Sequence, residues 1–345
     1  MAKPPHVGLE IWRNLYDAAL SYAQRRPWEI LSDLDLFALR SSLINETLYA
    51  CAIGQEGISY GLLLYRGEKG LASYRWLAEK GSRADVDGYI SRQNQITLEF
   101  VPRKELDKFD RVVIRNLGWA KLKSPMWPQF RTMRPYEPPW HLDEKEAMIL
   151  TLALVCGNDF VDRLRDRRLF LPLPANQIPA YEIFESAEGK LPKALPPPIG
   201  IAPPIYRPLP AKPLSVDPER IMRILDVAKP YKGSWEADIS TLKMVIGGED
   251  RPFIPLLLLI TDQQSGFILD SYLSKEVGEP HQILADGILN AMEKNRMRPA
   301  TILVKKGTLA ASLSPLAKAL KIPISEAKRL PMLDTARRAM QKHFL

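Results

Sequence analysis

The stretch 127–140 concentrates aromatic and cationic side chains, the residue types that bind bases, phosphates and proline-rich peptides. Aromatic rings stack on bases or on proline rings, and arginine adds a cation–π contact or a charge. Such a platform would use Trp127, Arg131, Arg134 and Trp140. The same rings could instead fix a proline-rich loop to the core, because aromatic side chains dominate core burial. Core packing is the favoured interpretation, and the binding interpretation stays open.

Lys305 and Lys306 form a second cationic group, at the end of a strand expected over residues 300–305. They could contact phosphate from the rim of a sheet, although a solvated strand end is the default interpretation. The net charge of +8 and the pI near 9.3 permit nucleic acid as a partner. No long block of like charge stands out, so protein and nucleic acid both stay open as partners.

Several kinds of site are excluded by residues that the sequence lacks. Two distant cysteines, Cys51 and Cys156, and four scattered histidines rule out a zinc site of Cys/His type. The sequence has no Ser/His/Asp grouping, P-loop, GxGxxG or HExxH. The N-terminus does not resemble a signal peptide, and the most apolar run, residues 254–260, is too short to cross a bilayer. Two thiols among apolar neighbours indicate a reducing cytoplasm, and no membrane partner is expected.

The N-terminal part alternates helical and strand periodicity, which indicates an α+β domain over residues 1–170. A glycine-bounded turn favours two paired strands, at 47–53 and 58–65. Asp143 and Glu144 open a long helix, where acidic groups suit the positive end of the helix dipole. The expected helices are 9–26, 28–40, 67–80, 104–117 and 141–167, and a further strand is expected at 95–101.

Residues 171–216 hold 12 of the 30 prolines. Proline removes an amide donor and fixes φ, so we expect neither a regular sheet nor a helix here. The stretch is interpreted as an extended, proline-rich connector. Its apolar residues, such as Ile178 and Tyr181, indicate that much of it lies against a domain surface.

Residues 217–345 give the clearest pattern. Three apolar segments joined by short turns, at 235–246, 253–261 and 267–273, predict antiparallel neighbours. The later strands alternate with helices, which implies parallel pairing through right-handed crossovers. We therefore predict an α/β domain with a mixed five-stranded sheet flanked by helices. The other expected elements are strands at 300–305 and 322–325 and helices at 218–228, 281–294, 308–321 and 333–344.

This element order, with the stretches WEADIS and RPFIPLLLLITDQQSGFIL, resembles the RNase H-like superfamily and its integrase cores over residues 233–345. In that superfamily, carboxylates hold two divalent metal ions that stabilise the attacking and leaving oxygens. The resemblance implies Asp238 as the first acid and Asp334, or else Glu326, as the third. Lys305 and the lysine after it stand where the second acid belongs, and two cations repel a divalent ion. The set of metal ligands is therefore incomplete.

A second resemblance spans most of the chain, and it is to an uncharacterised bacterial family with two domains. It is carried by GQEGISYGLLLYRGEKGL, WPQFRTMRPYEPPWHLDEKE, RPATILVKKGTLAASLSPLAKALKI and LPMLD. This resemblance implies no activity. We expect a non-catalytic binding or scaffold protein that needs no cofactor. The alternative is a nuclease or integrase-like enzyme that would use Asp238 and Asp334 with Mg²⁺ or Mn²⁺.

Overall fold

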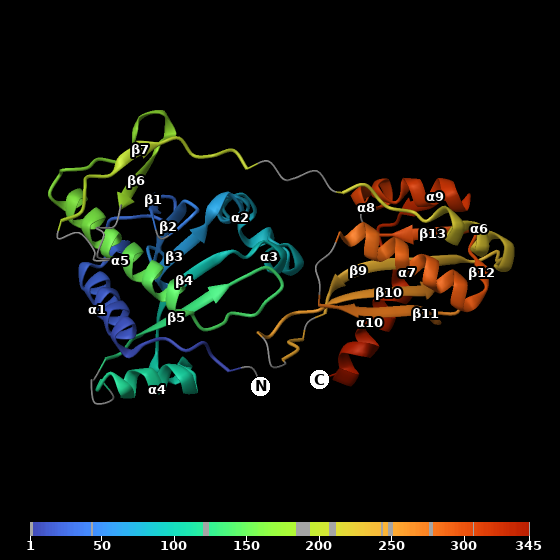
Figure 1. Ribbon diagram of the computed structural model, residues 1–345, viewed down its shortest axis with the longest axis horizontal. Helices are drawn as coiled ribbons and strands as arrows, with labels where there is room; N and C mark the ends of the chain where they lie inside the picture. The colour runs from blue at the N-terminus through green and yellow to red at the C-terminus, as the bar shows by residue number, and fades with distance from the viewer. Residues whose placement is uncertain are drawn as a thin grey trace. The chain divides into compact units, whose positions relative to one another are not determined.

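The computed structural model divides the chain into two compact units (Figure 1). One unit is Met1–Arg207 with Gly248–Arg251, and the other is Pro208–Gly247 with Pro252–Leu345. Each unit has its own sheet and its own apolar core. The structure describes residues 3–42, 44–119, 124–183, 194–206, 212–242, 244–247, 251–275, 279–305 and 307–344.

The N-terminal unit is built on a seven-stranded sheet with the order β5-β4-β3-β2-β1-β6-β7. Neighbouring strands are antiparallel except β1 and β6, which run parallel. The strands are β1 Leu36–Ser41, β2 Leu48–Ile53, β3 Tyr60–Arg66, β4 Gln95–Val101, β5 Trp127–Met133, β6 Ile178–Ile183 and β7 Ile199–Ile201.

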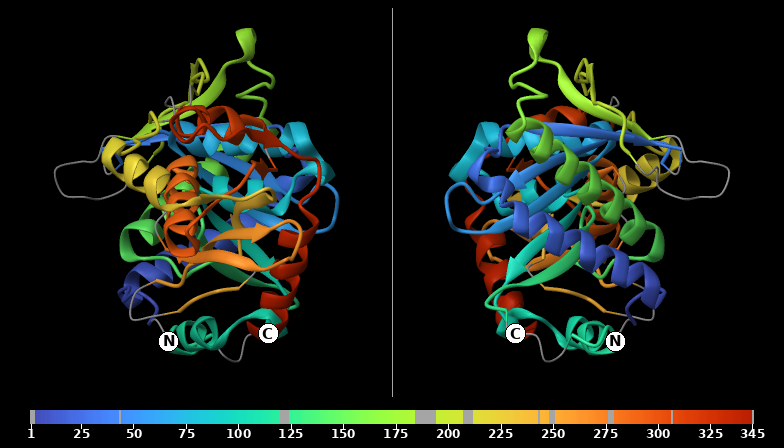
Figure 2. Two further views of the ribbon diagram at one scale, coloured as in Figure 1. Left: turned by 90° about the vertical axis from the view of Figure 1, so that its right-hand side faces the viewer. Right: turned by 90° about the vertical axis from the view of Figure 1, so that its left-hand side faces the viewer.

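Helices cover both faces of this sheet. On one face α1 (Leu9–Arg25) and α5 (Glu144–Arg165) lie side by side, as the right-hand view of Figure 2 shows in blue and green. On the other face α2 (Gly67–Lys80) buries Leu71 in a smaller apolar cluster. The short helices α3 (Val86–Arg92) and α4 (Lys108–Asn116) complete the described α-helices of this unit. The predicted α+β arrangement is thus present.

Two strands of this sheet, β6 and β7, come from the proline-rich stretch that was expected to lack regular structure. That expectation was wrong because the prolines are unevenly placed. Only Pro179 lies within β6, and the strand still pairs with β1 at Ala180 and Tyr181. Apart from Glu182, the other residues of β6 are apolar and buried, so the strand completes the core.

The segment 28–40 was also predicted wrongly, as a helix. Its last part is the strand β1, which is paired on one side with β2 and on the other with β6. The periodicity of residues 28–40 carries no information about their pairing with distant strands. This pairing overrides the helical preference of the segment. For the same reason Trp127–Met133 forms the strand β5 on β4 rather than an irregular loop.

The C-terminal unit contains the predicted mixed five-stranded sheet, in the order β11-β10-β9-β13-β14. The strands β9, β10 and β11 are antiparallel neighbours, whereas β13 runs parallel to both β9 and β14. The two-residue strands β8 and β12 form a separate pair. The bounds are β8 Lys229–Pro230, β9 Ser234–Thr241, β10 Leu256–Asp262, β11 Ile268–Ser274, β12 Met297–Arg298, β13 Thr301–Val304 and β14 Ile324–Glu326.

Different helices cover the two faces of this sheet. Trp235 and Ala237 of β9 point into the larger apolar core, to which α6 (Pro218–Val227), α7 (Pro280–Asn295) and α9 (Ser314–Leu320) contribute. The opposite face is covered by α10 (Pro331–Phe344), whose Leu333 and Ala336 pack against β10. The short helix α8 (Gly307–Ser312) precedes α9. Among the described residues of both units, we find no helix with the length and apolar character to span a membrane.

Candidate functional site

Asp238 lies in the middle of β9, on the face that α10 covers. Side chains alternate between the faces of a strand, so Glu236 shares this face. Both carboxyls are buried: Asp238 is 4% exposed and Glu236 is fully covered. A buried carboxylate needs a partner, because burial without one is costly.

Arg337 of α10 is the partner of Asp238. Its Nη2 donates to Oδ2 of Asp238 over 2.9 Å, and its Nη1 lies 3.4 Å from Oδ1 of Asp334. Burial raises the pKa of Asp238, and the charge of Arg337 offsets part of that rise. Asp238 and Asp334, the two acids predicted from the sequence, therefore both lie next to Arg337, which contacts each of them.

Lys305 adds a second positive charge beside Asp238. It follows β13, whose last residue Val304 pairs with Ala237, the neighbour of Asp238 on β9. Its charge lowers the pKa of Asp238, although less than burial raises it. Glu326, the alternative third acid, ends β14 and is exposed. Lys306 lies outside the described residues.

Among the described residues, Asp238 does not belong to a group of three or more acids or histidines close enough to share a metal ion. Mg²⁺ and Mn²⁺ need several hard oxygen ligands, and in two-metal sites the ligands hold a pair of ions. Here Asp238 already bonds to Arg337, and the charge of Lys305 acts on the same carboxylate. Two cations at this position oppose a divalent ion.

Glu236 is a site residue that the sequence interpretation missed. Its Oε2 accepts a hydrogen bond from the backbone N–H of Leu333, in the first turn of α10, over 2.9 Å. Its Oε1 is buried without a hydrogen-bond partner among the described residues. Burial raises the pKa of Glu236. The spacing of Glu236 and Asp238, two residues apart on one strand, is the signal that could have identified it.

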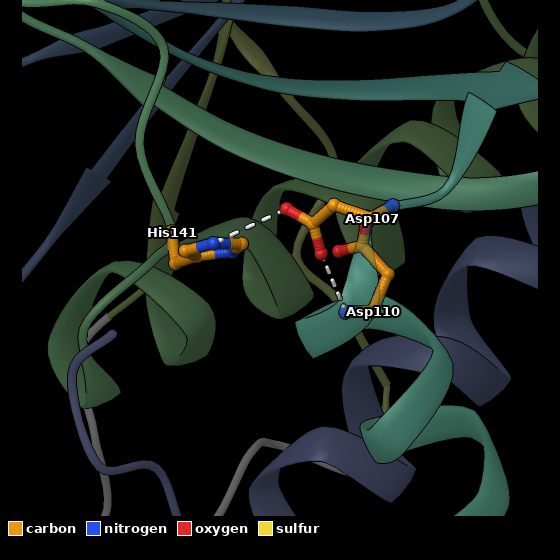
Figure 3. Close-up of side chains that lie close together, drawn as sticks. All are labelled: Asp107, Asp110 and His141. Carbon is orange, nitrogen blue, oxygen red and sulfur yellow. Dashed lines mark hydrogen bonds and ion pairs between the residues drawn. The ribbon is translucent and has the colours of Figure 1, made fainter. Parts of the chain in front are cut away.

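The N-terminal unit holds a different cluster, of Asp107, Asp110 and His141 (Figure 3). In the described part of the chain it is the one group whose spacing could suit a metal ion. Asp107 caps α4, and Asp110 in turn accepts a hydrogen bond from the backbone N–H of Asp107. His141 Nε2 lies 3.3 Å from Oδ2 of Asp107.

Arg131 of β5 occupies this cluster in place of a metal ion. Its two terminal nitrogens donate to both oxygens of Asp110, over 2.9 and 2.7 Å, and Nη2 also donates to Asp107 over 3.0 Å. Burial and the charge of Arg131 lower the pKa of His141, so the neutral ring can donate to Asp107. All four carboxylate oxygens thus accept hydrogen bonds from protein groups. Through these hydrogen bonds the cluster connects α4 to β5.

The aromatic stretch does not form the platform that the binding interpretation required. Trp127 is 3% exposed and belongs to the main apolar core, so it offers no face to a base. Arg131 is taken up by the aspartates, and Arg134 donates to the buried Glu146 over 2.9 Å. Trp140 is partly exposed beside His141. Core packing explains Trp127, and ion pairing explains the two arginines.

Two domain matches divide the chain. Residues 12–177 match the domain of unknown function DUF7309, and residues 220–341 match the domain of unknown function DUF6930. Neither description refers to an RNase H-like fold. No curated protein matches the chain. The chain thus matches DUF7309 followed by DUF6930, an order consistent with an uncharacterised two-domain family.

Proposed function

We propose that this chain is a non-catalytic binding protein whose C-terminal unit is a degenerate RNase H-like domain that binds nucleic acid. The strand order β11-β10-β9-β13-β14 supports the fold assignment, because the superfamily combines three antiparallel strands with two parallel ones in this order. One observation carries the functional part. The carboxylate of Asp238, where a nuclease would hold metal, is bonded to Arg337 instead.

Three exposed cations follow the carboxyl ends of β13 and β14, and β13 is the neighbour of β9 on which Asp238 lies. Lys305 follows β13, and Lys328 and Arg329 follow β14, and all three side chains are exposed. The strands β13 and β14 run parallel, and the backbone N–H of Ala327 donates to the carbonyl of Val304, so the two strands end side by side. Among the described residues, none of the three cations makes an ion pair. A phosphate backbone suits such a surface because its affinity comes from neutralised phosphates.

A salt series tests this function in the full-length protein. We expect fluorescent single- and double-stranded oligonucleotides to bind at low salt and to dissociate as salt rises. Each phosphate contact contributes about 0.9 to the slope of log K against log salt for duplex DNA. The triple change Lys305→Ala, Lys328→Ala and Arg329→Ala should therefore flatten the slope by up to about 2.7.

The matched control removes three exposed lysines elsewhere in the same unit: Lys229, Lys232 and Lys294. Lys229 and Lys232 precede β9, at the opposite end of the strand from the proposed surface. This control should keep the slope of the parent protein. Absence of binding at low salt would contradict the proposal. So would cutting of nucleic acid with Mn²⁺ that Asp238→Ala abolishes.

A reducing, cytoplasmic location is part of this proposal. Cys51 lies on β2 and Cys156 on α5, and both thiols are free and buried. Burial raises the pKa of Cys51 to about 12. A protonated, covered thiol is a poor nucleophile, so these cysteines are packing residues that suit a compartment without disulfide formation.

A further inference from the structure

Arg337 uses only part of its hydrogen-bonding capacity. A guanidinium has five N–H donors, and here Asp238 takes one at 2.9 Å while Asp334 lies at a long 3.4 Å. The Nε of Arg337 is buried and has no hydrogen-bond partner among the described residues. The side chain of Arg337 is 16% exposed, so it is not wholly closed off from solvent.

Arg337 bonds to the buried Asp238 and lies close to exposed cations. Arg338 follows it on α10 and is exposed, and Lys305 acts on the same carboxylate from β13. The charge of Arg337 is offset by Asp238, whereas Lys305 makes no ion pair among the described residues and Arg338 bonds only to groups of α10, the carbonyl of Asp334 and the hydroxyl of Thr335. Carboxylate and phosphate compete for the same planar fork of an arginine.

We infer that Asp238 is a built-in competing anion, which holds Arg337 away from the phosphates of the bound nucleic acid and so limits affinity. This inference rests on the proposed nucleic-acid binding and adds a regulatory role for one residue. The acid that would bind metal in a nuclease acts here as an internal substitute for phosphate. Removing its charge, while its shape is kept, releases one further cation to the ligand.

The test is Asp238→Asn in the full-length chain, with the same labelled duplex DNA over a salt series. We expect several-fold tighter binding at low salt and a slope of log K against log salt that is steeper by about 0.9, the value for one added phosphate contact. The control is Asp226→Asn on α6, an exposed acid on the opposite face of the sheet. It removes the same charge without touching Arg337, so its slope should stay that of the parent.

A double variant, Asp238→Asn with Arg337→Gln, removes the ion pair as a unit and leaves neither partner as an unpaired buried charge. Because Arg337 contributes nothing while it is paired, this variant should bind with the parent slope. It also gives a result if Asp238→Asn alone does not fold. A double-variant slope lower by about 0.9 would show that Arg337 already contacts phosphate, and would overturn the inference.

The outcomes separate this inference from the function on which it rests. If the parent protein does not bind at low salt, the proposed function fails. If the parent binds but Asp238→Asn behaves like Asp226→Asn, the function stands and the competing role of Asp238 is wrong. Tighter binding of Asp238→Asn, lost in the double variant, supports both.

Discussion

Replacing Arg131 by alanine is expected to lower the free energy of unfolding of the N-terminal unit by about 3–5 kcal/mol, as is typical when one partner of a buried ion pair is removed. The reason is Asp110, which is 5% exposed and receives two hydrogen bonds from this one guanidinium. Without Arg131 its carboxylate stays buried and loses its main counter-charge. Arg131→Lys keeps the charge but loses the bidentate geometry. Its free energy of unfolding should therefore lie between those of the parent and of Arg131→Ala.

The pH dependence identifies the cause of the loss. Burial alone would raise the pKa of Asp110, but the hydrogen bonds and charge of Arg131 lower it below 3.8. A lowered pKa stabilises the fold above pH 3.8, and this contribution is lost as the pH falls through the folded pKa. In Arg131→Ala the pKa of Asp110 should rise instead, because its carboxylate is buried without Arg131. Protonation at low pH removes this buried charge, so the difference in the free energy of unfolding between variant and parent should become smaller as the pH falls.

The change in the free energy of unfolding is measured in the full chain by urea unfolding. Hydrogen exchange in peptides that cover β4 and β5 monitors the unfolding of this unit. Arg26→Ala is the control, because Arg26 pairs with Glu29 on the surface, where both side chains are exposed. That exposed pair should contribute less than about 1 kcal/mol. An equal, small effect of both substitutions would show that the Asp107–Asp110 cluster does not depend on Arg131.

Glu236→Gln is expected to stabilise the C-terminal unit at neutral pH, by about 1–3 kcal/mol, the cost of one buried polar group without a partner. Glutamine keeps the oxygen that accepts from the N–H of Leu333, and it replaces the unpartnered Oε1 by an NH₂ group. Thr261 lies directly opposite on β10, and its hydroxyl is also buried without a partner. The new amide can donate to that hydroxyl.

The sign of the pH effect follows from the raised pKa of Glu236. The folded state takes up the proton before the unfolded state does, so the parent gains stability as the pH falls from the folded pKa toward 4.5. Glutamine has no such dependence. The advantage of Glu236→Gln should therefore be largest at neutral pH and should disappear below pH 4.5.

Hydrogen exchange in peptides from β10 and α10, over a urea series at several pH values, reports this difference for the C-terminal unit. Glu326→Gln is the matched control, because it removes the same charge from an exposed site on β14 of the same sheet. It should change stability little at any pH. A loss of stability in Glu236→Gln at neutral pH would mean that the charged form is needed at the start of α10.

The C-terminal sheet was predictable because its signals are local. Apolar strands of suitable length, joined by short turns and followed by alternating helices, specify neighbours without long-range information. The run Leu256–Asp262 is buried along its whole length, as an apolar central strand requires. Asp238 could likewise be assigned to the first of these strands.

The contacts of Asp238 could not be predicted in the same way. Its partner Arg337 is 99 residues away in the sequence, and an arginine near a chain end is typical of any solvated helix. The helix expected over residues 333–344 starts earlier, at Pro331, so Asp334 lies within its first turn. Only the packing of α10 on β9 decides which charged groups meet.

The parallel pairing of β6 with β1 determines where the N-terminal part can be separated from the rest. The DUF7309 match ends at residue 177, immediately before β6. A fragment cut there would expose the unpaired backbone of β1 and remove Tyr181, whose ring packs against Phe37. Open strand edges promote aggregation through edge-to-edge association. A recombinant fragment intended to stay dispersed should therefore extend at least through Ile201.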